Sequence, residues 1–330
     1  MNSFHNNSSV AEELAKIKTI SELNDRVQKD LEASKKHSDV EDRFETVVYG
    51  PPSMLLSYLF IRLGISPNTV TFLSLVFGVC GSLFFYPRHI VLNFIGIFIE
   101  LIAVLLDCSD GQVARLTHNS SQLGRFLDGL VDTLNFSAIY IAIGFRMMRE
   151  PIPFTHVRWQ AFIWIVIVIS GWCHAEEARL ADYYRVLHMY FLNYKSTAYY
   201  TSAARIRKEL EESKDTPFYN RLYLRMYLAY TSIQERMTPN MQKLLRAIEA
   251  SGGNISEELS DAYTSRSRKY VQLTNTLTFN IRAFMLFGLI LLRLHPFFFP
   301  FNIIVLGGLA IFMLAKYERI AKEVYESFFA

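Results

Sequence analysis

Long apolar runs alternate with polar, charge-rich stretches along the chain. A helix needs about 20 mostly apolar residues to cross the hydrocarbon core of a bilayer. Six runs come close to that length, and prolines fall in several of the short connections, where helices are expected to break. The runs are Thr69–Phe85, Ile90–Leu106, Gly124–Phe145, Trp159–Cys173, Leu273–Leu292 and Phe297–Leu314. The pattern predicts an all-α, polytopic membrane protein with six transmembrane helices.

The remaining segments are short or polar. Pro52–Leu63 is apolar but too short to span, so we expect an amphipathic helix at the membrane interface. Residues 174–268 are too polar to cross a bilayer, yet apolar and aromatic residues recur in them at helical spacing, which predicts a helical insert. The expected organisation is a polar segment over 1–50, the interfacial helix and four spans over 51–173, the insert over 174–268, and two spans with a tail over 269–330.

Lysine and arginine are distributed unevenly between the two sides of this six-span arrangement. The N-terminal segment, the acidic connection between the second and third spans, the insert and the C-terminal tail carry most of them and fall on one side. Because basic residues concentrate on the cytoplasmic side of membrane proteins, we expect both termini, the insert and the acidic connection to face the cytoplasm. The protein would then reside in a cytoplasmic or inner membrane.

Composition narrows the class of protein further. Hydrophobic residues make up 51% of the chain and charged residues 20%, and the second value lies below the roughly 25% of soluble domains. The net charge of +3 is modest and no nucleic-acid-binding motif occurs, so we expect no nucleic-acid partner. The cysteines are isolated and predict neither a disulfide framework nor a zinc site.

The candidate chemistry lies in residues 107–132, where four aspartates stand at the ends of two apolar runs. Asp107 and Asp110 are three apart and Asp128 and Asp132 are four apart, so each pair shares a helix face. Two antiparallel helices joined by a short link can bring the pairs together, where the charges would repel one another. Carboxylates are hard ligands suited to Mg²⁺ or Mn²⁺. The spacing indicates a divalent-metal site for a phosphoryl or diphosphate substrate, and a solvated acidic cluster is the alternative.

Small and basic residues accompany the acids. Gly111 follows Asp110 directly and Gly124 lies four residues before Asp128, where the lack of a side chain leaves room for a ligand. Ala114 has a small side chain that would likewise leave room for a ligand. Arg115 can bind phosphate oxygens or pair with an acid. Helix packing by the glycines and membrane anchoring by the arginine are the alternative interpretations.

Taken together, these residues resemble a known signature. The stretch fits D-x2-D-G-x2-A-R-x8-G-x3-D-x3-D, the motif of the CDP-alcohol phosphotransferases, at all eight fixed positions. A chance match is of order 10⁻⁹–10⁻¹⁰ per start site at average residue usage. The six-span plan and the Ser66-Pro67-Asn68-Thr69 entry to the first span are also similar to that family, whereas residues 1–45 and the insert are not clearly covered.

The resemblance implies an enzyme of phospholipid biosynthesis that transfers a phospho-alcohol group from a CDP-alcohol to an acceptor hydroxyl and releases CMP. The residues that would hold two divalent ions are Asp107, Asp110, Asp128 and Asp132. Asp132 would also act as the general base for the acceptor hydroxyl. The residues that would line or leave room for the cytidine-diphosphate site are Gly111, Ala114, Arg115 and Gly124. The resemblance also suggests a homodimer in the lipid bilayer.

Several assignments stay open. The donor is either CDP-diacylglycerol, with inositol phosphate, glycerol phosphate or serine as acceptor, or a small donor such as CDP-choline, with diacylglycerol as acceptor; we favour the first. A membrane prenyltransferase and a non-enzymatic scaffold or transporter are distant alternatives, because no second aspartate motif occurs and the metal-site spacing is intact. The residues that could contact the acceptor, unless they form ordinary helix surface or ion pairs, are Arg179, Asp182, Arg185 and Arg282.

Overall fold

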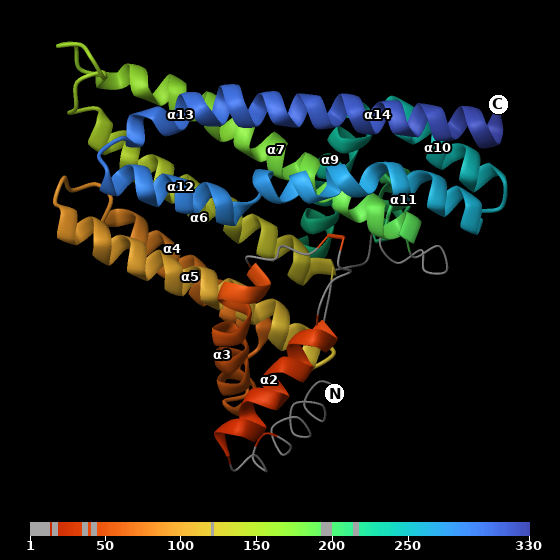
Figure 1. Ribbon diagram of the computed structural model, residues 1–330, viewed down its shortest axis with the longest axis horizontal. Coiled ribbons are helices and arrows are strands. Elements are labelled where there is room, and N and C mark those ends of the chain that lie inside the picture. The colour runs from red at the N-terminus through yellow and green to blue at the C-terminus, as the bar shows by residue number, and fades with distance from the viewer. Residues whose placement is uncertain are drawn as a thin grey trace. The chain divides into compact units, whose positions relative to one another are not determined.

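Every named secondary-structure element is a helix in the part of the chain that the computed structural model describes (Figure 1). The described residues are Leu14, 19–34, 39–40, 45–119, 122–192, 200–213 and 218–330. Their elements are α2 (Ile20–Ser34), η1 (Glu45–Tyr49), α3 (Gly50–Arg62), α4 (Pro67–Leu83), α5 (Ile90–Leu116), α6 (Gln122–Met147), η2 (Gln160–Phe162), α7 (Ile163–Leu192), α8 (Ala203–Glu212), α9 (Phe218–Met237), α10 (Pro239–Ala250), α11 (Glu257–Val271), η5 (Gln272–Leu277), α12 (Phe279–Leu291), η6 (His295–Phe297), α13 (Phe298–Phe301), η7 (Asn302–Leu306) and α14 (Gly307–Phe329). The predicted all-α class is confirmed.

Several of these helices have the length and apolar character of membrane spans. Within the described residues, five stretches qualify, and α4 is apolar but shorter. The five are Ile90–Leu116, Leu127–Met147, Gln160–Leu192, Glu257–Leu291 and His295–Phe329. Each predicted span therefore falls on an apolar helix, as in a multi-pass integral membrane protein, while the number of crossings stays a prediction.

The ends of α4 and α5 follow from local sequence signals. Ser66 caps α4, since its hydroxyl accepts the Thr69 backbone N–H at 3.3 Å, and Pro67 occupies the first turn. The second apolar run was expected to end at Leu106, but α5 continues to Leu116. The acidic stretch that follows the run is therefore helical, in agreement with the helical spacing of its acids, and Gly111 lies within the helix.

The chain divides into two compact units. The first comprises Met1–Gly171 and Ala283–Phe299, and the second comprises Trp172–Arg282 and Pro300–Ala330.

In the first unit, α4 packs against both α5 and α6. A Cβ added at Gly81 would lie 3.0 Å from the Glu100 side chain and 3.1 Å from the Gly96 carbonyl oxygen of α5. Gly78, one turn earlier, faces the Asn135 amide of α6. Small residues at these crossings allow the three helices to approach closely, as is usual for helices packed in membranes.

A cluster of charges joins three connections of the first unit. Glu150, which follows α6, pairs with Arg88 at 2.9 Å, Arg146 at 3.1 Å and His295 at 2.8 Å. These residues come from the α4–α5 connection, the end of α6 and the start of η6. The cluster therefore ties these chain segments together at one end of the unit.

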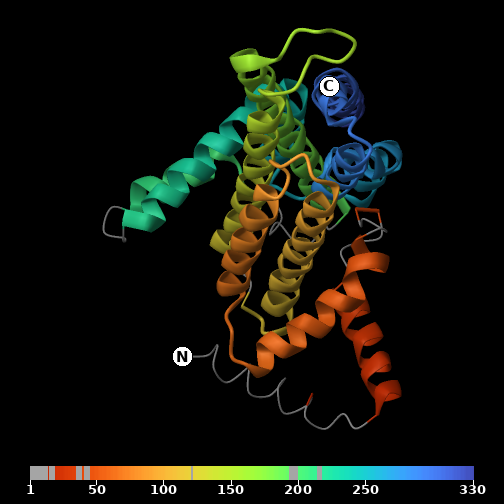
Figure 2. The same ribbon diagram turned by 90° about the vertical axis from the view of Figure 1, so that its left-hand side faces the viewer.

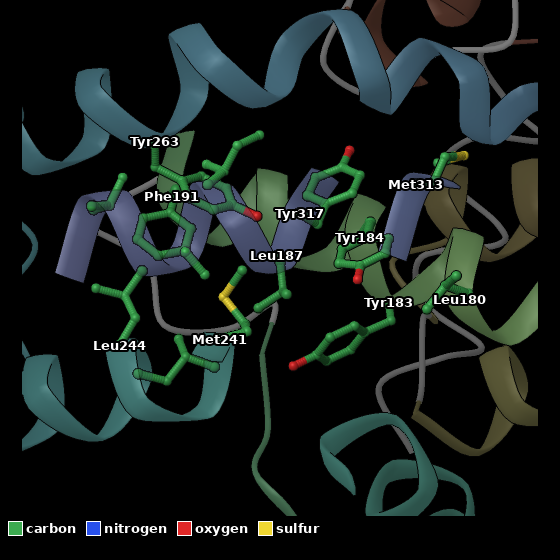
Figure 3. Packing of buried hydrophobic residues seen from close by; sticks show 14 of the residues in the cluster. Leu180, Tyr183, Tyr184, Leu187, Phe191, Met241, Leu244, Tyr263, Met313 and Tyr317 are labelled. Atoms are coloured by element: carbon green, nitrogen blue, oxygen red, sulfur yellow. The ribbon is translucent and has the colours of Figure 1, made fainter. Parts of the chain in front are cut away.

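The second unit has a core of apolar and aromatic side chains from α7, α10, α11 and α14 (Figure 3). Tyr184 and Tyr317 stack with ring centroids 3.7 Å apart, and Phe191 and Tyr263 stack at 3.9 Å. Glu318 of α14 accepts two backbone N–H groups at the start of α10, at 2.7 and 3.1 Å. The described part of the insert is thus a packed helical structure, as predicted.

Candidate functional site

Three of the four motif aspartates converge in the first unit. Asp107 and Asp110 lie near the C-terminal end of α5, and Asp128 lies in the second turn of α6. One carboxylate oxygen from each lies within 4.8 Å of the others. Asp110 is buried, at 5% exposure, and the other two are half-buried. Asp132 is also half-buried and lies one turn further along α6, on the face that carries Asp128.

The arrangement of the acids suits hard divalent cations. Two full negative charges about 5 Å apart repel by about 3 kcal/mol at an effective dielectric constant of 20, so three together are costly without a counter-charge. Carboxylate oxygens are the ligands that Mg²⁺ and Mn²⁺ prefer, and Mg²⁺ held by few carboxylates completes its shell with water and substrate phosphate. The donor set and its spacing therefore fit a metal centre.

Helix α4 contributes a further contact to this cluster. The Thr71 hydroxyl donates a short hydrogen bond to Oδ2 of Asp110, and it also lies 3.1 Å from the Pro67 carbonyl oxygen. Thr71 is 6% exposed. A buried hydroxyl that contacts a carboxylate fixes the orientation of its oxygens, as partners of metal ligands commonly do.

A buried ladder of polar groups joins α3 to the motif segment of α5. The Ser57 hydroxyl lies 3.0 Å from Oε1 of Gln112 and 3.2 Å from the Ser109 carbonyl oxygen. The Ser109 hydroxyl donates to the Ser53 carbonyl oxygen at 2.9 Å, and Gln112 Nε2 donates to Oγ of Ser53 at 2.9 Å. Ser109 and Gln112 occupy variable positions between the fixed residues of the motif. The ladder therefore fixes the rotation of α5, and with it the direction of the aspartates.

The small motif residues lie beside a basic one. A Cβ at Gly111 would lie 3.3 Å from Nη1 of Arg115, so glycine leaves room for the guanidinium one turn later. Arg115 is exposed, whereas Ala114 and Gly124 are half-buried. Their predicted role in binding cytidine diphosphate stays a prediction.

Two of the predicted acceptor residues contact α9 in the second unit. Arg179 binds both carboxylate oxygens of Glu176, at 2.5 and 2.6 Å, and its guanidinium lies 5.3 Å from the Tyr230 ring centroid. Asp182 accepts the Tyr230 hydroxyl at 3.2 Å. Burial and the neighbouring Asp182 carboxylate raise the pKa of Tyr230 well above its ordinary value. The phenol therefore stays protonated and remains a donor.

The other two predicted acceptor residues contact the segment around α12. Arg185 donates from Nε to Thr274 at 2.9 Å and from a terminal nitrogen to Asn275. Arg282 is fully buried and pairs with Glu177 at 2.5 Å, with Glu177 only 2% exposed. All four residues thus make protein contacts, and acceptor binding by them stays a prediction.

No sequence pattern predicted a role for Thr71, Ser57, Gln112 or Glu177. The available signal was weak, because each is a polar residue within or beside an apolar helix and such residues commonly bond only to their own helix. Their partners lie far along the chain, 39 residues away for Thr71 and 105 for Glu177. Only the packing of the helices identifies these pairs.

The sequence of this region matches a known family. A model of the family described as CDP-alcohol phosphatidyltransferase matches residues 64–181. Residues 64–181 thus form a CDP-alcohol phosphatidyltransferase domain. The phosphatidyltransferase domain contains every fixed position of the motif, together with α4, α5 and α6. The resemblance seen in the sequence is confirmed.

Relatives of the phosphatidyltransferase domain carry names from lipid biosynthesis. A phosphatidylinositol phosphate synthase of Streptomyces avermitilis is 39% identical over 80 residues, which cover 24% of this chain and 32% of the relative. An archaetidylinositol phosphate synthase of Pyrococcus horikoshii is 35% identical over 120 residues, which cover 35% of this chain and 58% of the relative. This chain therefore covers less than two thirds of the length of either.

Proposed function

We propose that this protein transfers a phosphatidyl group from CDP-diacylglycerol to the hydroxyl of a polar alcohol and releases CMP. The observation that carries the proposal is the gathering of Asp107, Asp110 and Asp128 within 4.8 Å in a chain with the complete family motif. The long apolar helices support a lipid-linked donor, because the diacylglycerol part of such a donor resides in the bilayer. CDP-choline with diacylglycerol as acceptor is the alternative.

In this reaction the acceptor oxygen bonds to the β-phosphorus of the CDP-alcohol. The bond from that phosphorus to the bridging oxygen breaks, and CMP leaves with the electron pair. Asp132 lies one turn beyond Asp128 and would take the proton of the attacking hydroxyl. Two divalent ions, Mg²⁺ or Mn²⁺, would neutralise the diphosphate when bound. Arg115 would bind a phosphate oxygen, and Gly111 would leave space beside it.

The names of the relatives suggest inositol phosphate as the first acceptor to test. A phosphorylated acceptor needs basic side chains, and Arg179, Arg185 and Arg282 of the second unit are the candidates, with Asp182 as a partner for an acceptor hydroxyl. A cytoplasmic orientation of the aspartates and a homodimer are part of the same proposal.

The test is acceptor-dependent release of CMP by the purified protein in detergent. The assay combines Mg²⁺ or Mn²⁺ with CDP-diacylglycerol or CDP-choline and a panel of acceptors. We expect release with one donor–acceptor pair, its loss in Asp132→Asn, and no change in Glu326→Gln. Glu326 is the matched control because it is an exposed acid on α14 whose only ion pair among the described residues is a long one to Lys322, at 3.8 Å. Folded protein that releases no CMP with any pair, or an active Asp132→Asn variant, would overturn the proposal.

A further inference from the structure

Helices α8 and α9, residues 203–212 and 218–237, form an arm of the second unit that is attached to α7 through the second half of α9. The Tyr230 hydroxyl donates to Asp182 at 3.2 Å, and the Gln234 side-chain amide donates to the Arg179 carbonyl oxygen at 3.1 Å. Helix α9 also packs against α8. Figure 2 shows this pair extending sideways from the other helices of the unit.

One face of α9 is both apolar and basic. Phe218 is 75% exposed, Leu222 43% and Met226 41%, and these residues recur at every turn of the helix. Arg225 and Arg236 are exposed on the same face, at helical spacing from Phe218 and Leu222. This face therefore presents large apolar side chains to the surroundings with arginines beside them.

Among the described residues of the arm, no acid of α9 lies on this face. The single acid in the sequence of α9 is Glu235, and its carboxylate accepts the Ala203 backbone N–H at 2.7 Å, at the start of α8. Helix α8 is different, because its three basic and three acidic residues balance one another. Its Lys208 is 77% exposed and pairs loosely with Glu212 at 3.9 Å. The positive charge and the apolar surface of the arm are thus concentrated on α9.

We infer that the exposed face of α9 binds the surface of the lipid bilayer and favours anionic headgroups. Apolar residues with flanking arginines on one helix face are the pattern of helices that lie in the headgroup layer. Exposing three large apolar side chains on successive turns to water is energetically unfavourable. A second copy of the chain is also a poor partner for this face, because a symmetric contact would bring the same arginines of the two copies together, where they would repel one another. A bilayer with anionic lipids complements both the apolar side chains and the arginines of this face.

The place where the arm is attached agrees with this inference. The apolar stretch that contains α7 begins at Gln160, and about 20 helical residues cross a hydrocarbon core of about 30 Å. Counted from Gln160, that length ends near Arg179, where α9 is attached. The root of the arm therefore lies at the level of the headgroups, within reach of the surface that its exposed face fits.

The test is site-specific photocrosslinking of the full-length protein in lipid nanodiscs. A photoreactive benzoylphenylalanine replaces Leu222 on α9, and in a matched control it replaces Lys208 on α8. Discs contain phosphatidylcholine alone or phosphatidylcholine with phosphatidylglycerol. We expect lipid adducts by mass spectrometry from position 222, more in the anionic discs, and few from position 208. The double substitution Arg225→Gln and Arg236→Gln should lower the preference for anionic discs by about fivefold per arginine removed.

Three outcomes would overturn the inference. Crosslinks from position 222 to a second copy of the chain would identify a subunit interface instead. Equal lipid adducts from positions 222 and 208 would show that the α9 face is not selective. Undiminished preference for anionic discs in the double arginine variant, with its size-exclusion profile unchanged, would show that these charges do not recognise the headgroups.

Discussion

Replacing Thr71 by valine tests how the phosphatidyltransferase domain positions its acids. Valine has nearly the shape of threonine, and Thr71 is 6% exposed, so the packing of α4 changes little. What is lost is the short hydrogen bond from the Thr71 hydroxyl to Asp110. The change therefore removes a donor from a buried carboxylate without opening a cavity.

The expected effect on metal binding is large. A hydrogen bond to a charged group contributes about 1.5–3 kcal/mol, and each 1.4 kcal/mol is a factor of ten in affinity. Loss of the Thr71 bond frees the Asp110 carboxylate to rotate away from Asp107 and Asp128, whose oxygens lie within 4.8 Å of it. We expect Thr71→Val to weaken Mn²⁺ binding by about 10- to 100-fold, the range typical for residues that orient metal ligands.

The assay is titration of the purified protein with Mn²⁺, followed by electron paramagnetic resonance of the free ion. Thr71→Ser keeps the hydroxyl and should restore most of the affinity. Thr264→Val is the matched control, because Thr264 is a buried helical threonine whose hydroxyl donates to the Ser260 carbonyl oxygen of its own helix at 2.8 Å. Folded Thr71→Val protein that binds Mn²⁺ as tightly as the unaltered protein would refute the reasoning.

Three further predictions concern stability, each measured by thermal unfolding in detergent. Ser57→Ala removes a buried partner of Gln112 and should cost about 1–3 kcal/mol; an unchanged midpoint would show that the ladder does not hold α3 to α5. Burial alone would raise the pKa of Glu150, but its basic neighbours hold that pKa at about 2, below the ordinary 4.5. Its contribution, about 3 kcal/mol, is complete above pH 4.5 and is lost as the pH falls toward 2, and Glu150→Gln should abolish this acid-dependent loss. Breaking the buried Glu177–Arg282 pair with Glu177→Gln or Arg282→Met should cost about 3–5 kcal/mol, whereas the double variant should recover much of the loss; additive effects would contradict this.

Much of the helix architecture could be predicted because its signals are local. Apolar runs of sufficient length predict membrane helices wherever they occur, and Ser66 with Pro67 marks the start of α4 through contacts within one turn. The apolar run that predicted the second span ends at Leu106, where the composition changes, while the helical backbone of α5 continues through Asp107 and Asp110 to Leu116. Hydropathy indicates the apolar part of a helix and not its hydrogen-bonded length.

The sequence by itself determined the motif and predicted its chemistry. The spacing of Asp107, Asp110 and Asp128 within their helices is a property of the helical repeat, so which acids share a face follows without any tertiary information. The residue types alone predict hard divalent cations, because carboxylate oxygens are the ligands that such cations prefer.

The tertiary structure alone decided which residues meet between helices. That Thr71 contacts Asp110, that Arg282 pairs with Glu177, and that the arm of α8 and α9 turns a basic, apolar face outward depend on how each helix is rotated and where it crosses its neighbours. Rotation and crossing result from the packing of many side chains at once, including small residues such as Gly81 at a crossing. The pattern of a single segment does not contain that information.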